Sequence, residues 1–244
     1  MRGGNLRAGL TRFMNISEYK YKIETHAHTS PSSPCADLKP CEVIERYAAL
    51  GFDAVAITNH FCKHSFLVDE YEAVKKDILG DYYAAKNAGE KYGIKVILGM
   101  EMRFPENSND YLLYGIDEND IKALYDFTST DYVTFYKNFK NDKNVILQAH
   151  PFRKGIVLQD PQFLDGIETF NVHPHHNSRI SLATRYAKKY PHFITTCGSD
   201  FHHDGHEGLG GILSKTLPQD SYALSNLLKS RDFLFNVAGS IVIP

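Results

Sequence analysis

Histidine is the residue type that stands out in this sequence. The chain has 12 histidines in 244 residues, and they cluster around His26, His60, His150, His173 and His202. Histidine is the commonest metal ligand in proteins and titrates near neutral pH, so it also carries protons in catalysis. This clustering indicates a metal centre or a catalytic site before any motif is considered.

Two short motifs place pairs of metal-binding side chains two residues apart. His26 and His28 follow one apolar run, and Asp200 and His202 follow another. Side chains at positions i and i+2 of a strand point to the same side, so each pair can hold one cation. Imidazole and carboxylate ligands together suit zinc, manganese or iron. Each motif also has a purely structural interpretation, as surface histidines in the first pair and as a helix N-terminus in the second.

Three further polar side chains follow apolar runs directly, namely His60, Glu101 and His150. A single histidine after a strand is more often an ordinary loop residue than a metal ligand. Because the same arrangement recurs at successive predicted strand ends, we interpret these three residues as parts of one metal site.

A third group of residues could act on a substrate. His173, His175 and His176 follow the sixth predicted strand and could supply a ligand, a phosphate contact or a general acid, or could be solvated loop residues. Arg103 and Arg153 each lie close behind a candidate ligand. An arginine fork matches phosphate oxygens in geometry and charge, so both arginines are candidate anion clamps.

The elements that must position these residues alternate along the chain. Seven apolar runs predict strands, at Tyr21–Thr25, Ala54–Thr58, Lys95–Gly99, Tyr111–Tyr114, Val145–Gln148, Gly166–Phe170 and Phe193–Thr196. Longer patterns predict helices near Cys41–Leu50, Asp69–Tyr92, Glu118–Asn141, Arg179–Lys189 and Ser221–Ser230. This alternation predicts a mostly parallel sheet. Nearly every predicted strand is followed by a candidate ligand, which favours a closed barrel, because a barrel gathers its strand ends on one face.

Length and composition limit the domain organisation. A chain of 244 residues fits one large α/β barrel or two small domains. No repeat, linker or low-complexity segment divides it, so we expect a single domain over 1–244, with 1–20 as a candidate loose leader. Hydrophobic residues at 43% and charged residues at 23% exclude a disordered chain, a collagen and a coiled coil.

Charge, hydropathy and cysteine content narrow the partners and the compartment. The net charge of −2 excludes a dedicated binder of long nucleic acid or of an anionic membrane surface. No apolar run approaches the roughly 20 residues that cross a bilayer. The four cysteines form no CxxC motif and are too few for a disulfide framework, so we expect a protein of the reducing cytoplasm.

The motifs, taken in order, resemble those of one known superfamily. HAHT, ITNH, GMEM, QAHPF, IETFN and GSDFHH, which span Glu24 to Gly211, resemble the motifs of the polymerase and histidinol phosphatase (PHP) superfamily. The resemblance implies an α/β fold, a distorted (β/α)7 TIM-like barrel, with two or three divalent metal ions. It further implies that the fold is used mostly for phosphoester hydrolysis.

The resemblance also implies which residues hold each metal ion. Glu101 would bridge the first metal to a second one, which also takes His150, and a third metal would take His60 and His202. The first metal would take His26, His28, Glu101 and Asp200.

Three departures from the superfamily pattern affect the metal sites. Asn59 replaces the usual acid before His60, and the strand Tyr111–Tyr114 lacks the histidine that many members carry there. The histidine or aspartate that often lies about six residues after the HxH pair is also absent. Cys35 and Asp37 are the candidate replacements. A Ser-Pro-Cys stretch at this point resembles a subgroup of bacterial members. Occupancy of the third site is therefore left open.

The expected reaction is hydrolysis of a small phosphate monoester by attack of a metal-bridging hydroxide, with zinc, manganese or iron as the metal. Glu101 would bridge the metals, and Arg153 or Arg103 would stabilise the transferred charge. His202 or His173 would deliver a proton to the leaving group.

Three other functions stay open at this point. They are a phosphodiesterase or nuclease acting on short oligonucleotides, a metal-dependent amidohydrolase, and a non-catalytic metal-binding module. A small phosphorylated molecule is the expected partner. The sequence leaves the oligomeric state undetermined.

Overall fold

The computed structural model describes residues 15–244. Of the candidate leader, residues 1–14 lie outside the described part. The short 3-10 helix η1 (Ile16–Glu18) follows them, and Tyr19 is buried against Leu213 and Leu234.

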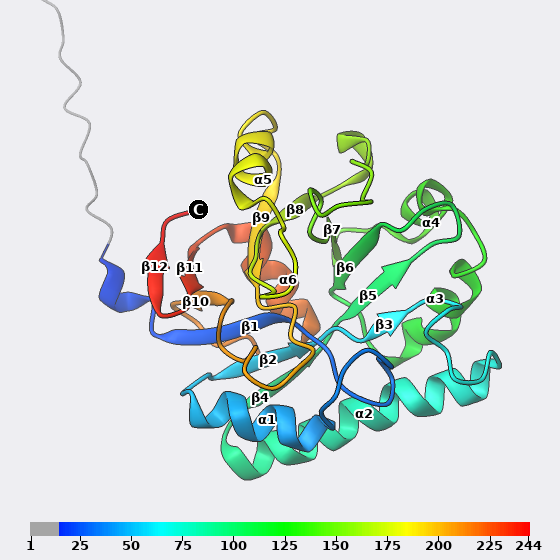
Figure 1. Cartoon of the computed structure of the whole chain (residues 1–244), viewed down its shortest axis with the longest axis horizontal. Helices are drawn as coiled ribbons and strands as arrows, with labels where there is room; N and C mark the ends of the chain where they lie inside the picture. The colour runs from blue at the N-terminus through cyan, green and yellow to red at the C-terminus, as the bar shows by residue number, and fades with distance from the viewer. Residues whose placement is uncertain (1–14) are drawn as a thin grey trace, which may run out of the picture.

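The described strands form two six-stranded sheets (Figure 1). One sheet has the order β12-β11-β10-β1-β2-β4, and the other has the order β3-β5-β6-β7-β8-β9. The strands are β1 (Tyr21–Ala27), β2 (Ala54–Ile57), β3 (His60–Phe61), β4 (Lys95–Leu98), β5 (Met100–Arg103), β6 (Asp110–Tyr114), β7 (Val145–Gln148), β8 (Gly166–Asn171), β9 (Ile194–Gly198), β10 (Ile212–Ser214), β11 (Phe233–Val237) and β12 (Ser240–Val242).

The two sheets are connected by strands that run from one into the other. The chain passes from β2 to β3 across two residues, and from β4 to β5 across Gly99 alone. A Cβ atom at Gly99 would lie 2.9 Å from Thr58 Cγ2, so only glycine fits without displacing a neighbour. An isolated parallel bridge also joins Ala27, at the end of β1, to Phe201, which follows β9.

The mixed α/β class is confirmed, but the predicted closed and mostly parallel barrel is not. The strand pairings described here leave two separate sheets rather than one closed sheet. Five of the ten strand pairs are antiparallel. β6 is antiparallel to both neighbours. Its pairing with β5 is antiparallel because the short segment 104–109 that joins them cannot hold a crossover helix. Register shifts in β1 and β8 interrupt the ladders further.

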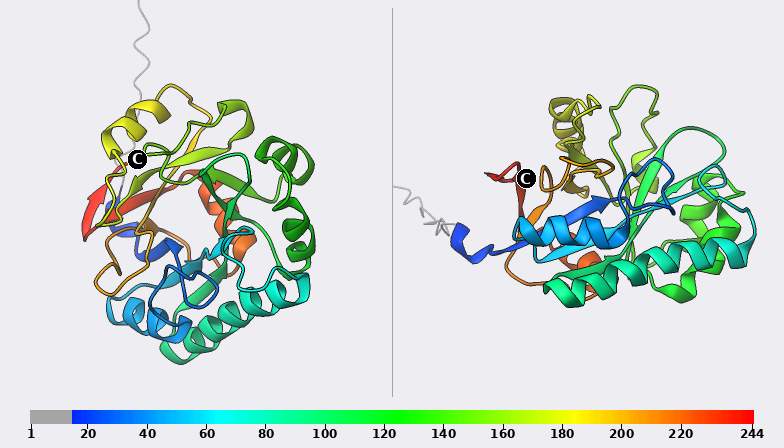
Figure 2. Two further views of the ribbon diagram at one scale, coloured as in Figure 1. Left: turned by 45° about the vertical axis from the view of Figure 1, so that its right-hand side comes forward. Right: turned by 60° about the horizontal axis from the view of Figure 1, so that its bottom comes forward.

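Most of the helices lie around the outside of the strands (Figures 1 and 2), whereas the last one, Ser221–Ser230, contacts strands of both sheets. The short 3-10 helices η2 (Glu118–Asp120) and η3 (Pro161–Phe163) accompany them. Within residues 15–244, no helix combines the length and apolarity needed to cross a membrane. The α-helices are α1 (Pro40–Ala49), α2 (Tyr71–Tyr92), α3 (Ile121–Phe127), α4 (Tyr132–Phe139), α5 (Ile180–Ala187) and α6 (Ser221–Ser230).

The prediction of one helix over Glu118–Asn141 is wrong, because this stretch contains η2, α3 and α4 in succession. The side chain of Asp131 accepts a hydrogen bond from the Thr134 backbone N–H and so begins α4 as a new helix. An N-terminal aspartate satisfies a backbone donor that the helix itself leaves free.

Apolar packing leaves one end of the strands free for polar side chains. The Leu224 and Leu228 side chains of α6 pack with the apolar residues of β4, β6, β7 and β9. Val43 and Ile44 of α1 pack against the outer side of β2. Since apolar groups fill the interior from the α6 side, the polar residues of the motifs gather at the other end of the strands.

Candidate metal centre

Ligand atoms of four residues from distant parts of the chain converge at this end of the strands. His26 Nε2 lies 3.1 Å from His28 Nε2, 3.2 Å from Glu101 Oε1 and 3.3 Å from Asp200 Oδ1. His28 Nε2 lies 3.4 Å from both Glu101 Oε2 and Asp200 Oδ1. Four ligands at about 2.0–2.1 Å from one tetrahedral cation lie roughly 3.3 Å from one another. These four residues therefore fit a single metal ion.

The charges of this cluster fit a bound cation. The buried carboxylates outnumber the neighbouring arginines by two. The carboxylates are Glu101, Asp110, Glu168 and Asp200, and the arginines are Arg103 and Arg153. Burial lowers the pKa values of His26 and His60, but the neighbouring carboxylates outweigh this and raise them, so these two histidines hold the balancing protons when no metal is bound. A divalent cation would replace these two protons and keep the buried charge balanced.

Glu168 fixes the orientation of the first ligand. Its Oε1 accepts a hydrogen bond from His26 Nδ1 at 3.0 Å, and its Oε2 accepts from the His150 backbone N–H and from Asn171 Nδ2. An ionised carboxylate can only accept, so the His26 ring carries its hydrogen on Nδ1. Nε2, which faces Glu101, is therefore the ring atom left to bind a metal ion once its proton is displaced. The sequence shows Glu168 in the IETFN motif but assigns it no role.

Electrostatics place these groups in the protonation states that metal ligands need. Burial opposes ionisation of Glu101, yet the neighbouring His26 and His60 hold its pKa well below the ordinary value. Burial, together with the neighbouring His202 and His60, lowers the pKa of His28 well below its usual range. Burial also lowers the pKa of His26, but Glu168, Asp200 and Glu101 outweigh this and raise it. A cation would displace the proton that His26 otherwise holds.

A second group of ligand atoms shares Glu101. His60, Glu101 and Asp110 could hold a metal ion together. His150 Nε2 lies 3.2 Å from Glu101 Oε1 and 3.7 Å from Asp110 Oδ2. Arg103 donates two hydrogen bonds to Asp110, at 2.7 and 2.6 Å. The structure therefore brings His150 to Glu101, as expected, and adds an aspartate that the sequence analysis missed.

Asp110 was missed because of the direction of its strand. The sequence pattern predicts ligands at the ends of parallel strands, directly after each apolar run. β6 runs antiparallel to β5, and Asp110 at its start pairs with Arg103 at the end of β5. An aspartate at the beginning of a strand that follows a short turn is the signal that could have identified it.

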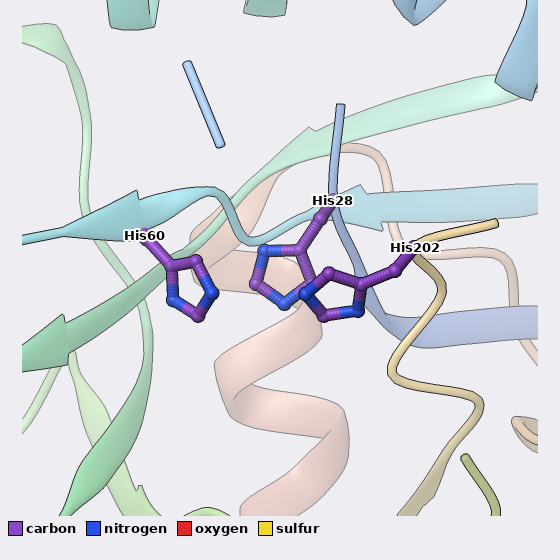
Figure 3. Close-up of side chains that lie close together, drawn as sticks. All are labelled: His28, His60 and His202. Atoms are coloured by element: carbon purple, nitrogen blue, oxygen red, sulfur yellow. The ribbon is translucent and has the colours of Figure 1, made fainter. Parts of the chain in front are cut away.

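Three histidines form a third group at the same mouth (Figure 3). The His28 ring centroid lies 4.4 Å from that of His60 and 4.2 Å from that of His202. Cys35 lines the same cavity. The alternative residue Asp37 does not line this cavity and accepts a hydrogen bond from His203 Nδ1, so Cys35 is the one of the two that faces this group.

The Cys35 thiol is unusually acidic. Partial burial raises its pKa, but hydrogen bonds with His202 and His60 dominate and lower the pKa to about 6. A thiolate, rather than a thiol, is therefore the main form of this side chain at neutral pH.

Asn59, which replaces the usual acid, organises the neighbouring loop. Its Oδ1 accepts hydrogen bonds from the Thr29 backbone N–H at 2.7 Å and from Ser33 Oγ at 3.0 Å. Asn59 Nδ2 donates to Thr29 Oγ1. The departure from the superfamily pattern thus supports the loop that carries Cys35.

The predicted arginines and the His173 group line one cavity of about 270 Å³ together with the ligands. Arg153 donates to Asp200 Oδ2 at 2.6 Å and to Asn171 Oδ1 at 2.8 Å. His173 Nδ1 accepts from the His175 backbone N–H, and burial lowers the pKa of His173 to about 3. His175 and His176 lie at the cavity rim beside it. His173 is therefore a neutral hydrogen-bonding group near neutral pH.

The backbone is constrained where it presents the ligands. His150 and Asp200 have φ values of 30° and 54°, in the left-handed region, which costs on the order of 1 kcal/mol for such residues. At Gly198, a Cβ atom would lie 2.5 Å from His26 Cβ and 2.9 Å from Glu168 Oε1. The end of β9 therefore packs directly against the side chains of the first ligand group.

Comparisons with known proteins agree with this geometry. The sequence profile of the PHP domain matches residues 24–206. DNA polymerase III PolC-type from Caldanaerobacter subterraneus is 38% identical over 157 residues, and that from Clostridium perfringens is 28% identical over 159 residues. Each match covers 64% of this chain and 9% of the polymerase. The chain thus spans about a tenth of the length of these relatives.

Solved structures show the same fold at low sequence identity. A two-domain protein from Bacteroides vulgatus, which contains a predicted PHP-like metal-dependent phosphoesterase, has a TM-score of 0.65 and 16% identity over 91% of this chain and 66% of its own. PsfC from Pseudomonas syringae has a TM-score of 0.55 and 16% identity over 79% of this chain and 80% of its own. Since the family profile covers well over half of the sequence, this chain belongs to the PHP domain family.

Proposed function

We propose that this protein is a metal-dependent phosphoesterase that hydrolyses a small phosphate monoester. The observation that carries the proposal is the convergence of His26, His28, Glu101 and Asp200 on one point, with a second ligand group that shares Glu101. Paired metal sites of this kind are suited to displacement at phosphorus.

The cavity around these ligands supports a small anionic substrate. Its volume of about 270 Å³ lies near the lower end of the range for small-molecule sites. Arg103 and Arg153 line it, and each is held by one carboxylate, Asp110 and Asp200 respectively. Arginines fixed in this way can present their remaining N–H groups to phosphate oxygens without losing much side-chain entropy.

Divalent ions bound by these residues would neutralise phosphate charge and lower the pKa of water to near neutrality. Glu101 lies between the two ligand groups: its Oε1 is 3.2 Å from both His26 Nε2 and His150 Nε2, and its Oε2 is 3.4 Å from His28 Nε2 and 2.8 Å from His60 Nδ1. Arg153 and Arg103 would hold the phosphoryl oxygens during the displacement. His202 donates Nδ1–H to the Asp200 carbonyl oxygen at 2.8 Å. This leaves Nε2 for a ligand or proton-transfer role, and the low pKa of His173 makes His202 the better proton donor of the two.

The test is hydrolysis of p-nitrophenyl phosphate, its bis-ester and a short oligonucleotide after loading with zinc, manganese or iron. We expect the monoester to be preferred, and Glu101→Gln to lose at least about 100-fold in rate while remaining folded. Asp37→Asn, which changes an exposed carboxylate, is the matched control. Activity in Glu101→Gln equal to that of the wild type would overturn the proposal.

A phosphodiesterase or nuclease is the second candidate function. The relatives named above are DNA polymerases, and the same metal centre could act on a diester. The net charge of −2 disfavours long nucleic acid but allows a short oligonucleotide. Preference for the bis-ester or the oligonucleotide in the same assay would establish this alternative.

The four cysteines are free thiols, which supports a cytoplasmic location.

A further inference from the structure

We propose that the substrate is the phosphate ester of a short polyhydroxylated alcohol, and that His173 and His203 bind the hydroxyl groups of this alcohol. The inference rests on the proposed phosphoesterase function and deepens it by naming the class of leaving group. It also gives a role to histidines that lie outside the metal-ligand groups.

The cavity that contains the metal ligands has a polar lining. Its thirteen described lining residues are histidine, arginine, aspartate, glutamate or cysteine, and none of them has a hydrocarbon side chain. Small-molecule sites are usually lined mainly by hydrophobic and aromatic side chains, so an alkyl or phenyl leaving group would find few partners here. A hydroxylated carbon chain can exchange its hydrogen bonds with water for hydrogen bonds with this lining.

The phosphoryl group and the alcohol have separate places in this cavity. Arg103 and Arg153, which would hold the phosphoryl oxygens, are each paired with a carboxylate of the metal site. The lining residues beyond these are mainly histidines, namely His173, His175, His176 and His203. The His173 ring centroid is 5.5 Å from that of His202, so this group of histidines begins directly beside the metal ligands. An ester held at the metals would therefore extend its alcohol toward these rings.

His173 and His203 offer opposite hydrogen-bonding groups. His173 Nδ1 accepts a hydrogen bond from the His175 backbone N–H at 3.1 Å, so the ring hydrogen lies on Nε2, which is a donor. His203 Nδ1 donates to Asp37 Oδ2 at 2.8 Å, which leaves Nε2 of the neutral ring as an acceptor. The two ring centroids are 6.5 Å apart. A hydroxyl group both donates and accepts, so it matches this pair of rings, whereas an alkyl chain satisfies neither ring.

The loop that carries His173 is fixed at both of its ends. Before His173, the Val172 backbone N–H donates to the Gly198 carbonyl oxygen at 3.1 Å. After it, Ser178 Oγ donates to Asn171 Oδ1 at 2.8 Å and ties the end of the loop back to β8. The position of the His173 ring is therefore built into the fold.

His206 supports both rings from outside the cavity. It is buried and does not line the cavity. Its ring centroid lies 4.8 Å from that of His173 and 5.2 Å from that of His203. Since one buried ring packs against both, the two hydrogen-bonding groups keep their separation before substrate binds, which lowers the entropy cost of binding.

The cavity volume favours a short alcohol. About 270 Å³ must also hold the metal ions and the phosphoryl group, and a water molecule alone takes a share of about 30 Å³ in the liquid. The four histidines outside the metal site include no arginine or lysine partner for a second anionic group. A short polyol or sugar with a single phosphate fits these limits better than a nucleoside or a bisphosphate.

Glycerol 3-phosphate and n-propyl phosphate provide a matched test, because they differ only in two hydroxyl groups. The full-length protein is loaded with zinc, manganese or iron, and the release of inorganic phosphate gives kcat/KM for each ester. We expect the wild type to prefer glycerol 3-phosphate by about 10–100-fold, since a site built to bind hydroxyl groups rejects an analogue that lacks them.

The variants assign this preference to His173. We expect the ratio of the two kcat/KM values to fall about 10-fold in His173→Phe, which keeps a ring but removes the N–H donor. His173→Gln, whose amide can still donate, should retain most of the ratio. His192→Phe is the matched control, because His192 is exposed and does not line the cavity, and it should show the wild-type ratio. Circular dichroism establishes that each variant is folded.

The outcomes separate this inference from the proposed function. Equal kcat/KM values for the two esters in the wild type, or hydrolysis of p-nitrophenyl phosphate but of neither ester, overturn the inference and leave the phosphoesterase in place. An equal fall for both esters in His173→Phe assigns His173 to proton transfer and overturns its role in binding the alcohol. Failure of the metal-loaded wild type to hydrolyse any of the three esters overturns both proposals.

Discussion

Replacing Glu168 with glutamine should weaken metal binding far more than it weakens the fold. Glu168 accepts three hydrogen bonds, from His26 Nδ1 on Oε1 and from His150 N–H and Asn171 Nδ2 on Oε2. A glutamine has one accepting oxygen and one donating nitrogen. It can therefore satisfy only one side of this arrangement.

The glutamine amide can lie in two orientations, and the free-energy cost of each decides which one forms. A hydrogen bond to a charged group contributes about 1.5–3 kcal/mol. An amide nitrogen facing His150 N–H and Asn171 would lose two such bonds, whereas a nitrogen facing His26 would lose one. The second orientation makes His26 Nδ1 an acceptor and moves the ring hydrogen to Nε2, the atom 3.2 Å from Glu101. That hydrogen blocks the lone pair that a cation needs.

We therefore expect Glu168→Gln to lose about 1.5–3 kcal/mol of unfolding free energy and about 10–100-fold in zinc affinity. Urea denaturation of the chelator-treated protein measures the first quantity, and zinc titration in chelator buffers measures the second. Glu24→Gln is the matched control, because Glu24 is also buried but accepts from the His26 backbone N–H rather than from its ring. Burial raises the pKa of Glu24 to about 7, so a neutral side chain there is a small change in charge.

Two results would refute this reasoning. Zinc affinity equal to that of the wild type in Glu168→Gln would show that the hydrogen on His26 is not controlled by Glu168. An equal loss of affinity in Glu24→Gln would show that the effect comes from replacing any buried carboxylate beside His26, rather than from the hydrogen bond to its ring.

Three further predictions follow from the site geometry. Asp110→Asn should lose the cation of the second ligand group and keep that of the first, which elemental analysis will measure; unchanged metal content would exclude Asp110 as a ligand. Because its pKa is lowered from 9.0 to about 6, Cys35 in the chelator-treated protein should be alkylated faster as pH rises through 6 and level off above 7. The alkylation rate is followed by peptide mass spectrometry, and a Cys35 rate that keeps rising above pH 7 would count against the shift. Gly198→Ala should lower the unfolding free energy by about 1–3 kcal/mol in thermal or urea denaturation, since its Cβ would lie 2.5 Å from His26 Cβ; wild-type stability would contradict that close contact.

Local sequence patterns were sufficient to locate most of the strands and ligands. Apolar runs at Ala54–Ile57 and Val145–Gln148 form β2 and β7 as predicted. The i, i+2 spacing brought His26 and His28 to one side of the β1 end, as expected from strand geometry. Strands β3, β5 and β10 to β12 were not predicted, although the apolar run Phe233–Val237 was a usable signal for β11.

The sequence by itself determined which side chains can act as ligands, because residue type and the two-residue repeat of a strand are local properties. Only the tertiary structure decided that the sheets stay separate and that β6 runs antiparallel and brings Asp110 to the site. It also decided that Cys35, rather than Asp37, faces His60 and His202. These outcomes depend on strand pairing and loop hydrogen bonds between residues far apart in the chain, and no local periodicity encodes such contacts.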